Sequence, residues 1–195
     1  LLTAKTREES DRLLGEFFEM KHKRFATMGV ADVFAEPGVK AFFRRLFAEA
    51  LIKEQPDFVL DALEVGGTLR AVTGSSRCGS RLICEFGAIR EDELAQASPG
   101  DFLFFENIQR ACNDGFAIYD FSVGDEHYKR MWCDIESRQF DVLVPLTAKG
   151  RLLALARRAI TRGKSWVKNN SAAWAVVKKF RRHGAKQAET AQHED

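Results

Sequence analysis

Apolar residues recur at helical spacing in two segments near the start of the chain. In residues 6–26, the leucines and phenylalanines fall mostly on one face of a helix. In residues 37–55, apolar residues again recur three and four positions apart, and Pro37 suits a first helical turn because its missing N–H has no partner there. The spacing predicts two amphipathic helices, the first ending at Gly29 and the second before Pro56.

The hydrophobic period then shortens to that of β-strands. Residues 58–65, 68–75 and 82–89 predict three strands, separated by the turn dipeptide Gly66-Gly67 and by a turn at 78–80. Short turns of this kind join neighbouring antiparallel strands. We therefore expect an antiparallel meander in the middle of the chain.

The second half alternates helices and strands. An apolar helical stripe follows Ser98-Pro99-Gly100-Asp101 and ends at Gly115. After it the sequence predicts a strand over 116–121, a helix over 125–133 and a strand over 140–146. The strand–helix–strand step between residues 82 and 121 needs a crossover, which favours a parallel pair. The predicted fold class is α+β, with a mixed, mostly antiparallel sheet flanked by helices.

Composition narrows the class of protein further. With 45% hydrophobic and 30% charged residues in a 195-residue chain, a packed core is expected and intrinsic disorder is excluded. No apolar run is long enough to span a membrane, and neither a signal peptide nor an initiator Met is present. We expect a cytoplasmic piece of a longer chain. The four cysteines and four histidines are scattered, so we expect buried cysteines, no disulfide framework and no metal site.

Charge is divided unevenly along the chain. Residues 149–195 carry 12 Lys and Arg but 3 Asp and Glu, a balance of 12 − 3 = +9, although the whole chain has a net charge of +2. This shift predicts a boundary near Gly150, between a domain over residues 1–148 and a basic helical tail over 149–195.

The segment Ser98–Asp101 is the first candidate for chemistry. Ser98 can cap the following helix, Pro99 suits its first position, and Asp101 completes a capping box. The same helix start exposes backbone N–H groups that bind phosphate, and Gly100 lets an anion approach the backbone. Asp101 argues against an anion, because its carboxylate already faces the positive end of the helix.

Ionisable residues gather in a second segment, residues 120–132. Tyr128 can act as a proton donor and Lys129 can pair with a phosphate. Spacing alone equally fits an ordinary amphipathic helix that turns Tyr128, Met131 and Trp132 to the core. Earlier in the chain, Glu85 lies mid-strand, either on a solvated face or as a general base.

Together these residues resemble a known family. The sequence Ser98-Pro99-Gly100, a helix to Gly115, then Tyr119-Asp120-Phe121, Gly124 and Tyr128-Lys129 resembles a GNAT-type acyltransferase domain. It is most similar to the GNAT proteins of cellulose and exopolysaccharide biosynthesis, the CelD/BcsL group. The resemblance covers about residues 6–146 and implies a first strand cut short or missing, with a further domain preceding this chain.

The resemblance implies transfer of an acyl group from acetyl-CoA to an amine or hydroxyl, here of a sugar or polysaccharide precursor. Ser98, Gly100 and Asp101 would hold the CoA pyrophosphate, and Asp120, Gly124 and Lys129 would complete the cofactor site. Tyr128 would protonate the departing thiolate, and Glu85 would be the general base. Pro99 departs from the family loop, which has Gly at that position and so offers one more N–H donor.

Two other functions stay open. The related Fem-type transferases use aminoacyl-tRNA, so an aminoacyl or peptidyl transferase is one alternative. A non-catalytic GNAT-like module of a polysaccharide biosynthesis complex is the other. The basic tail, which contains Trp166 and Trp174, has three possible roles: a solvated helix packed on the domain, a peripheral contact with an anionic inner membrane, or a nucleic-acid binding segment. We expect nucleic-acid binding only if the donor is an aminoacyl-tRNA.

Overall fold

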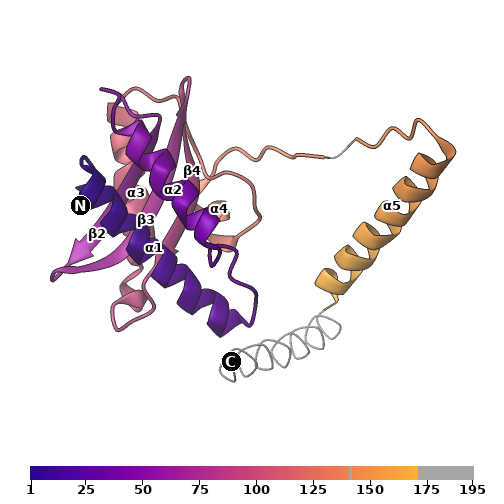
Figure 1. Cartoon of the computed structure of the whole chain (residues 1–195), viewed down its shortest axis with the longest axis horizontal. Coiled ribbons are helices and arrows are strands. Elements are labelled where there is room, and N and C mark those ends of the chain that lie inside the picture. Colours follow the sequence, from indigo (N-terminus) through magenta and orange to yellow (C-terminus); the bar gives the residue numbers. More distant parts are fainter. Residues whose placement is uncertain (141, 171–195) are drawn as a thin grey trace. The chain divides into compact units, whose positions relative to one another are not determined.

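The computed structural model describes residues 1–140 and 142–170, and among residues 164–169 it describes the backbone alone. The chain divides into two compact units, each considered by itself below (Figure 1). Residues 1–27 and 31–133 form the first unit. The second contains residues 28–30 and the chain from Asp134 onward.

A five-stranded sheet with the order β1-β2-β3-β4-β5 forms the centre of the first unit. Strands β1 to β4 pair antiparallel, whereas β4 and β5 pair parallel, as the crossover between them requires. The strands are β1 (Leu2–Thr3), β2 (Phe58–Val65), β3 (Thr68–Cys78), β4 (Arg81–Ile89) and β5 (Ile118–Asp120). This mixed α+β architecture confirms the predicted fold class.

Helices cover both faces of the sheet (Figure 1). Helices α1 (Arg7–Met28) and α2 (Pro37–Ala50) bury leucines and phenylalanines against one face, in a cluster centred on Phe17. Helix α3 (Pro99–Asn113) covers the other face, where Leu103 packs on β2 and β3 residues. The last helix of this unit is the short α4 (His127–Trp132), after β5.

Most predicted elements are present, but the strand over 140–146 is not. Among the described residues of that segment no strand forms, and Phe140 and Leu146 are exposed. Pro145 gives the physical reason, since proline has no N–H to donate to a sheet. A strand that the periodicity missed, β1, is two residues long, in agreement with the shortened first strand that the family resemblance implies.

One glycine in β3 fixes the packing of the aromatic core. Gly74 lies opposite Phe86 of β4, whose ring covers it so closely that an added Cβ would meet the ring at 2.1 Å. The same ring contacts Phe17, Phe43 and Phe47, with centroids 4.4–5.8 Å away. A side chain at position 74 would therefore displace a ring that joins α1 and α2 to the sheet.

We expect Gly74→Ala to destabilise the protein by about 1–3 kcal/mol, the usual cost of overpacking a core. Chemical denaturation would measure the change. Gly87, which lies on the neighbouring strand with ordinary space around it, provides the matched control, because an added Cβ there meets its nearest atoms at 3.5 Å. Equal losses in Gly74→Ala and Gly87→Ala would contradict this account of the Phe86 packing.

The second unit contains helix α5 (Ala148–Asn169). Thr147 begins it: its hydroxyl accepts the N–H of Gly150 at 3.0 Å, a typical N-cap bond. Helix α5 confirms that the basic tail begins as a helix. Trp174 and the rest of residues 171–195 lie outside the described residues. The boundary near Gly150 stays a prediction. In the part of the chain that the structure describes, no helix is long and apolar enough to cross a membrane.

Candidate active site

Strands β4 and β5 part at the edge of the sheet. They pair over three positions, ending with Ile83 opposite Asp120. Beyond that point β4 continues to Ile89 beside β3, whereas the chain after Asp120 leaves the sheet for α4. Among the described residues, the later half of β4 therefore has no strand partner on its β5 side, and its backbone groups there are available to a ligand.

A β-bulge lies at the start of this parted region. Ser75 pairs with Cys84 and Gly74 pairs with Phe86, so Glu85 is the extra residue of β4. Its side chain is exposed and accepts a hydrogen bond of 2.6 Å from the Ser76 hydroxyl. Glu85 therefore lies on a solvated face beside the parted strands, and its role as a general base stays a prediction.

The start of α3 differs from the predicted capping box. Ser98 does occupy the N-cap position and Pro99 the first turn, but Ser98 has a left-handed backbone (φ 52°, ψ 54°) and its side chain makes no capping bond. The reason lies in the 3-10 turn over residues 95–97, which ends at the same Ser98 and forces the chain to reverse there. The first-turn N–H groups of α3 consequently gain no side-chain cap from Ser98.

Gly100 and Asp101 have other partners in the structure. An added Cβ on Gly100 would meet the Ile89 side chain at 2.8 Å, so glycine at this position allows α3 to approach β4 closely. The carboxylate of Asp101 accepts a hydrogen bond of 3.1 Å from the indole N–H of Trp132, which ties α4 to α3. Asp101 thus holds the two helices together instead of closing a capping box.

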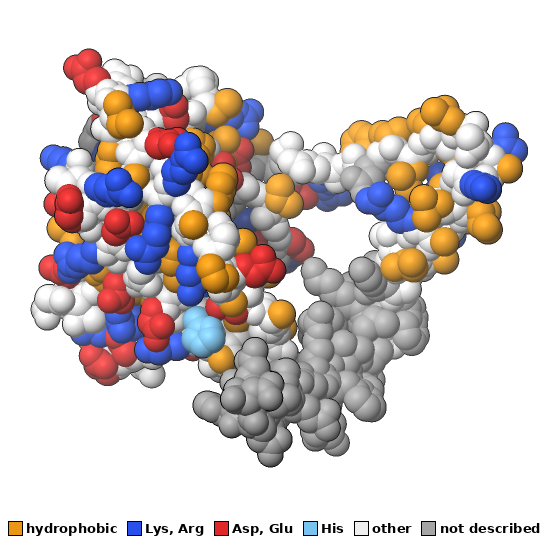
Figure 2. All heavy atoms as spheres, viewed as in Figure 1, with side chains coloured by type: hydrophobic (Ala, Val, Ile, Leu, Met, Phe, Trp, Pro, Cys, Tyr) orange, Lys and Arg blue, Asp and Glu red, His pale blue; other side chains and the backbone are white. Residues whose placement is uncertain are grey.

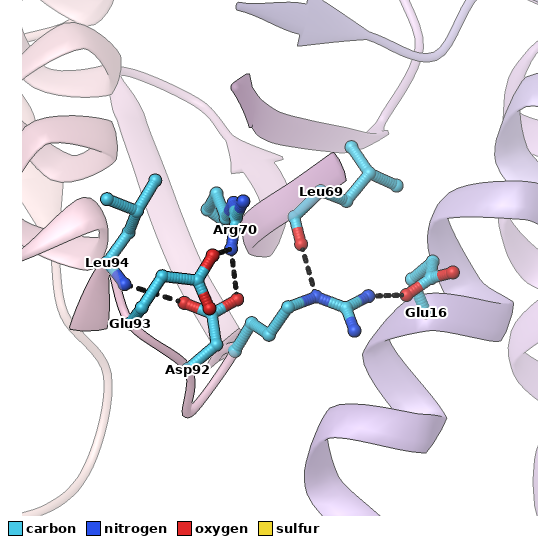
Figure 3. Close-up of polar contacts among 7 residues, drawn as sticks. Glu16, Leu69, Arg70, Asp92, Glu93 and Leu94 are labelled. Carbon is cyan, nitrogen blue, oxygen red and sulfur yellow. Dashed lines mark hydrogen bonds and ion pairs between the residues drawn. The ribbon is translucent and has the colours of Figure 1, made fainter. Parts of the chain in front are cut away.

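Ion pairs fix the segment that leads from β4 into α3 (Figure 3). Arg70, on β3, pairs with Asp92 and Glu93, and Asp92 also accepts the N–H of Leu94 at 3.0 Å. Arg90 pairs with Glu16 of α1 and donates to the Leu69 carbonyl at 2.9 Å. The Arg70 and Asp92 side chains are only 11% and 17% exposed, so this anchor is partly desolvated and holds the approach to the α3 start in place.

The predicted residues after β5 shape a tight loop. The carboxylate of Asp120 accepts the N–H of Ser122 at 2.8 Å and pairs with Arg81 at 3.2 Å. Gly124 has φ 140°, a backbone conformation that residues with a side chain rarely adopt. Asp120 and Gly124 therefore set the path from β5 to α4.

Lys129 is buried, contrary to the amphipathic pattern that placed the charges of α4 in water. Its ammonium donates to the carbonyls of Ser122 and Val123, at 3.3 and 3.0 Å, and pairs with Glu126. Met131, which the pattern assigned to the core, is exposed. The Lys129 ammonium thus fastens the loop after β5; its predicted contact with a phosphate stays a prediction.

Tyr128 lies at the centre of an aromatic cluster beside the parted strands. Its ring stacks on Phe104 of α3, with centroids 5.3 Å apart, and meets Phe121 edge-on at 5.9 Å. Burial, and next the acidic groups of Cys84 and Glu126, raise the pKa of Tyr128 to about 12. The half-buried phenol therefore stays protonated at neutral pH, which suits a proton donor.

Sequence reasoning did not single out the buried polar groups beneath α3. The Tyr119 and Ser75 hydroxyls are buried and have no hydrogen-bond partner among the described residues. Cys84 is also buried, and this burial raises its pKa to about 11. The other three cysteines are exposed, contrary to the sequence prediction. The sequence contains one signal that could have pointed to Tyr119, since Tyr119 and Tyr128 are the two tyrosines of the chain.

Both tyrosines should ionise late in the folded protein. Burial raises the pKa of Tyr119 above its ordinary value as well as that of Tyr128, whereas an unfolded tyrosine titrates near pH ~10. Absorbance titration should show little phenolate in the native protein at pH ~10.5 and about three-quarters ionisation in denaturant. Because the unfolded chain loses protons first, stability should fall as the pH rises above ~10. Phenolate forming at the same pH in both states would contradict the burial of these groups.

The arrangement brings together an open strand edge, a helix start and a protonated phenol. Strand β4 and the α3 start lie next to each other at Ile89 and Gly100, and Tyr128 packs on α3 itself. The described residues contain no group of three His, Cys, Asp or Glu placed to hold a metal ion. Such a site is suited to binding an extended anionic ligand between the strands and donating a proton to it.

Residues 2–130 match the family model described as acetyltransferase (GNAT) domain, and the chain belongs to this family. The match confirms the predicted enzyme class, an acetyltransferase of the GNAT type. No curated protein matches the chain significantly.

Solved structures that match the chain include the PaiA N-acetyltransferase of Thermoplasma acidophilum in complex with coenzyme A. This match has 12% sequence identity and a TM-score of 0.44, and it covers 59% of this chain and 74% of that one. An aminoglycoside acetyltransferase from an uncultured soil metagenomic sample, meta-AAC0020, matches in complexes with sisomicin and with trehalose. Those matches have 13% and 12% identity and TM-scores of 0.47 and 0.46, and each covers 71% of this chain and 93% of that one.

Proposed function

We propose that this chain transfers an acetyl group from acetyl-CoA to an amine or hydroxyl of a sugar or polysaccharide precursor, as a cytoplasmic enzyme. The observation that carries the proposal is the parting of β4 and β5 beside the start of α3, within reach of the aromatic cluster of Tyr128. Membership of the GNAT family supports the acetyl donor. The saccharide acceptor rests on the sequence resemblance.

The residues at the α3 start fit the phosphate end of CoA. The amides of Gly100 and Asp101 precede the first intrahelical bond, which Phe102 donates to Ser98 at 3.1 Å. Gly100 has no side chain to keep an anion from the backbone, and the helix dipole favours negative charge there. Pro99 contributes no N–H, and the Asp101 carboxylate is held by Trp132, so two backbone amides are the donors that remain.

Bound acetyl-CoA would supply the acetyl group as a thioester, and the chain's own residues then have three tasks. The unpaired side of β4 binds and orients the extended part of the donor. The Tyr128 phenol, which is protonated at neutral pH, holds the proton that a departing thiolate takes. The loops around the donor are held in their conformation by Ser98, Asp120, Gly124 and Lys129.

Glu85 is the proposed general base for the acceptor. Its carboxylate is exposed at the bulge next to the parted strands, where an incoming amine or hydroxyl can reach it. We expect Glu85→Gln to lower kcat/KM about a hundredfold, the usual contribution of a positioned base, without loss of stability. Glu91→Gln, at another exposed carboxylate, is the matched control. A rate unchanged by Glu85→Gln would remove this residue from the mechanism.

Acetyl transfer from radiolabelled acetyl-CoA to amino sugars, neutral sugars and aliphatic amines tests the proposal directly. Labelling of a sugar in preference to the simple amines is the expected result. Labelling of amines alone would reject the saccharide acceptor. Transfer from aminoacyl-tRNA instead of acetyl-CoA would favour the Fem-type alternative, and donor binding without transfer to any acceptor would favour the non-catalytic module.

A further inference from the structure

Helix α5 has an apolar face with basic residues along its edge. Leu152, Leu155 and Ala159 recur three and four residues apart, flanked by Leu153 and Ile160, which makes one apolar face. The four large side chains of this apolar face are exposed by 58–71%. Arg151, Arg158 and Arg162 line one edge of this face, because they lie four positions before Leu155 and three and seven positions after it. Hydrophobic and basic side chains lie next to each other along the helix in Figure 2.

The charge of this helix has one sign. Residues 148–169 contain seven Lys and Arg, and residues 142–170 contain no Asp or Glu. Basic residues four positions apart, such as Arg158 and Arg162, repel each other along a helix in water. A surface of negative charge would relieve that repulsion, and an apolar boundary would cover the leucines.

We propose that α5 binds the surface of an anionic lipid membrane. It would lie in the plane of the headgroups, with its leucines toward the acyl chains and its arginines among the phosphates. At 22 residues the helix is about 33 Å long, enough for several headgroup contacts at once. The segment before it adds to the apolar contact, because Val142, Val144 and Leu146 are also exposed by 71–90%.

The charge pattern favours a membrane over the other occupants of such a face. A second copy of α5 would bring the same unbalanced positive charge with it, so pairing of two copies is opposed by repulsion. Nucleic acid would neutralise the arginines but leave the leucines in water. A lipid surface satisfies both sides of the helix at once.

Vesicle flotation with the whole chain tests the proposal. We expect binding to vesicles of equal parts phosphatidylglycerol and phosphatidylcholine, little binding to phosphatidylcholine alone, and release at high salt. Arg158→Gln with Arg162→Gln should weaken binding about fivefold for each charge removed, whereas the Lys variants at both positions should keep it. Leu152→Gln with Leu155→Gln should weaken it about tenfold or more, and Thr161→Gln, on the side of the helix away from Leu152, should not.

Four results would overturn the proposal. They are equal binding to neutral and anionic vesicles, no binding to either by the folded chain, vesicle binding that the leucine variants retain in full, and self-association that those variants abolish. Tight binding to duplex RNA that depends on the arginines and not on the leucines would likewise assign the helix to nucleic acid.

Discussion

Replacing Tyr128 with Phe is expected to lower kcat about a hundredfold while leaving donor binding and stability nearly unchanged. The phenylalanine ring keeps the stacking on Phe104 and the edge contact with Phe121, since both involve the ring and not the hydroxyl. What is lost is the proton that the phenol holds at neutral pH because its pKa lies at about 12. Steady-state kinetics with an active acceptor would measure the change.

Tyr119→Phe is the matched control for that experiment. It removes the other phenol of the chain, whose hydroxyl is buried and has no partner among the described residues. Removing an unsatisfied buried hydroxyl should be neutral or slightly stabilising, and it should leave the rate within a few fold. Equal rate losses in the two variants, or none in Tyr128→Phe, would contradict the assignment of the proton donor to Tyr128.

Replacing Arg110 with Met should cost about 3 kcal/mol of stability, or roughly 10 °C in Tm. Arg110 of α3 pairs with Asp61 of β2, which is 2% exposed, and donates to the Thr3 hydroxyl at 2.8 Å. The variant leaves the Asp61 carboxylate buried with the Thr3 hydroxyl but without a cation, and that uncompensated charge is the source of the loss. Because these bonds join α3 to β1 and β2, α3 should also be held less firmly.

Thermal and chemical denaturation would measure the Arg110 effect. Arg45→Met is the control, because Arg45 forms an exposed ion pair with Glu49 whose loss should cost at most about 1 kcal/mol. Adding Asp61→Asn to Arg110→Met should recover part of the loss by removing the stranded charge. A loss in Arg110→Met no larger than that in Arg45→Met would show that the buried pair does not anchor α3.

The framework of this fold follows from hydrophobic periodicity. The two N-terminal helices and the three-stranded meander were predictable because each buries a face whose period is visible in the sequence. The parallel β4–β5 pair was predictable from the helix that connects the two strands. The strand over 140–146 was predicted wrongly since apolar content was given more weight than Pro145. The length of β1 could not be read from periodicity, because two residues are too few to have a period.

The site was less predictable because its details depend on contacts between distant residues. Ser98 and Asp101 have the spacing of a capping box, yet a turn before α3 sets the backbone of Ser98 and the Trp132 indole binds Asp101. Lys129 has the polarity of a surface residue, yet the loop carbonyls of Ser122 and Val123 surround its ammonium. Local spacing contains none of these partners.

The central claim, that acetyl-CoA binds between the parted strands and the start of α3, is tested most directly by thermal unfolding with and without acetyl-CoA. Free CoA and ATP serve as ligand controls. At about 100 times its Kd, acetyl-CoA should add roughly 2.7 kcal/mol of stability, and free CoA should act similarly.

Two glycines that each follow a proline at a helix start allow a matched comparison. Gly100→Ala should reduce the stabilisation by acetyl-CoA, because the added Cβ meets Ile89 and moves α3 from β4; Gly38→Ala should not, because the space beside Gly38 is open. Stabilisation of the wild type and of Gly38→Ala, with a loss in Gly100→Ala, is the result that this account predicts. A well-folded wild-type protein that acetyl-CoA does not stabilise would contradict it.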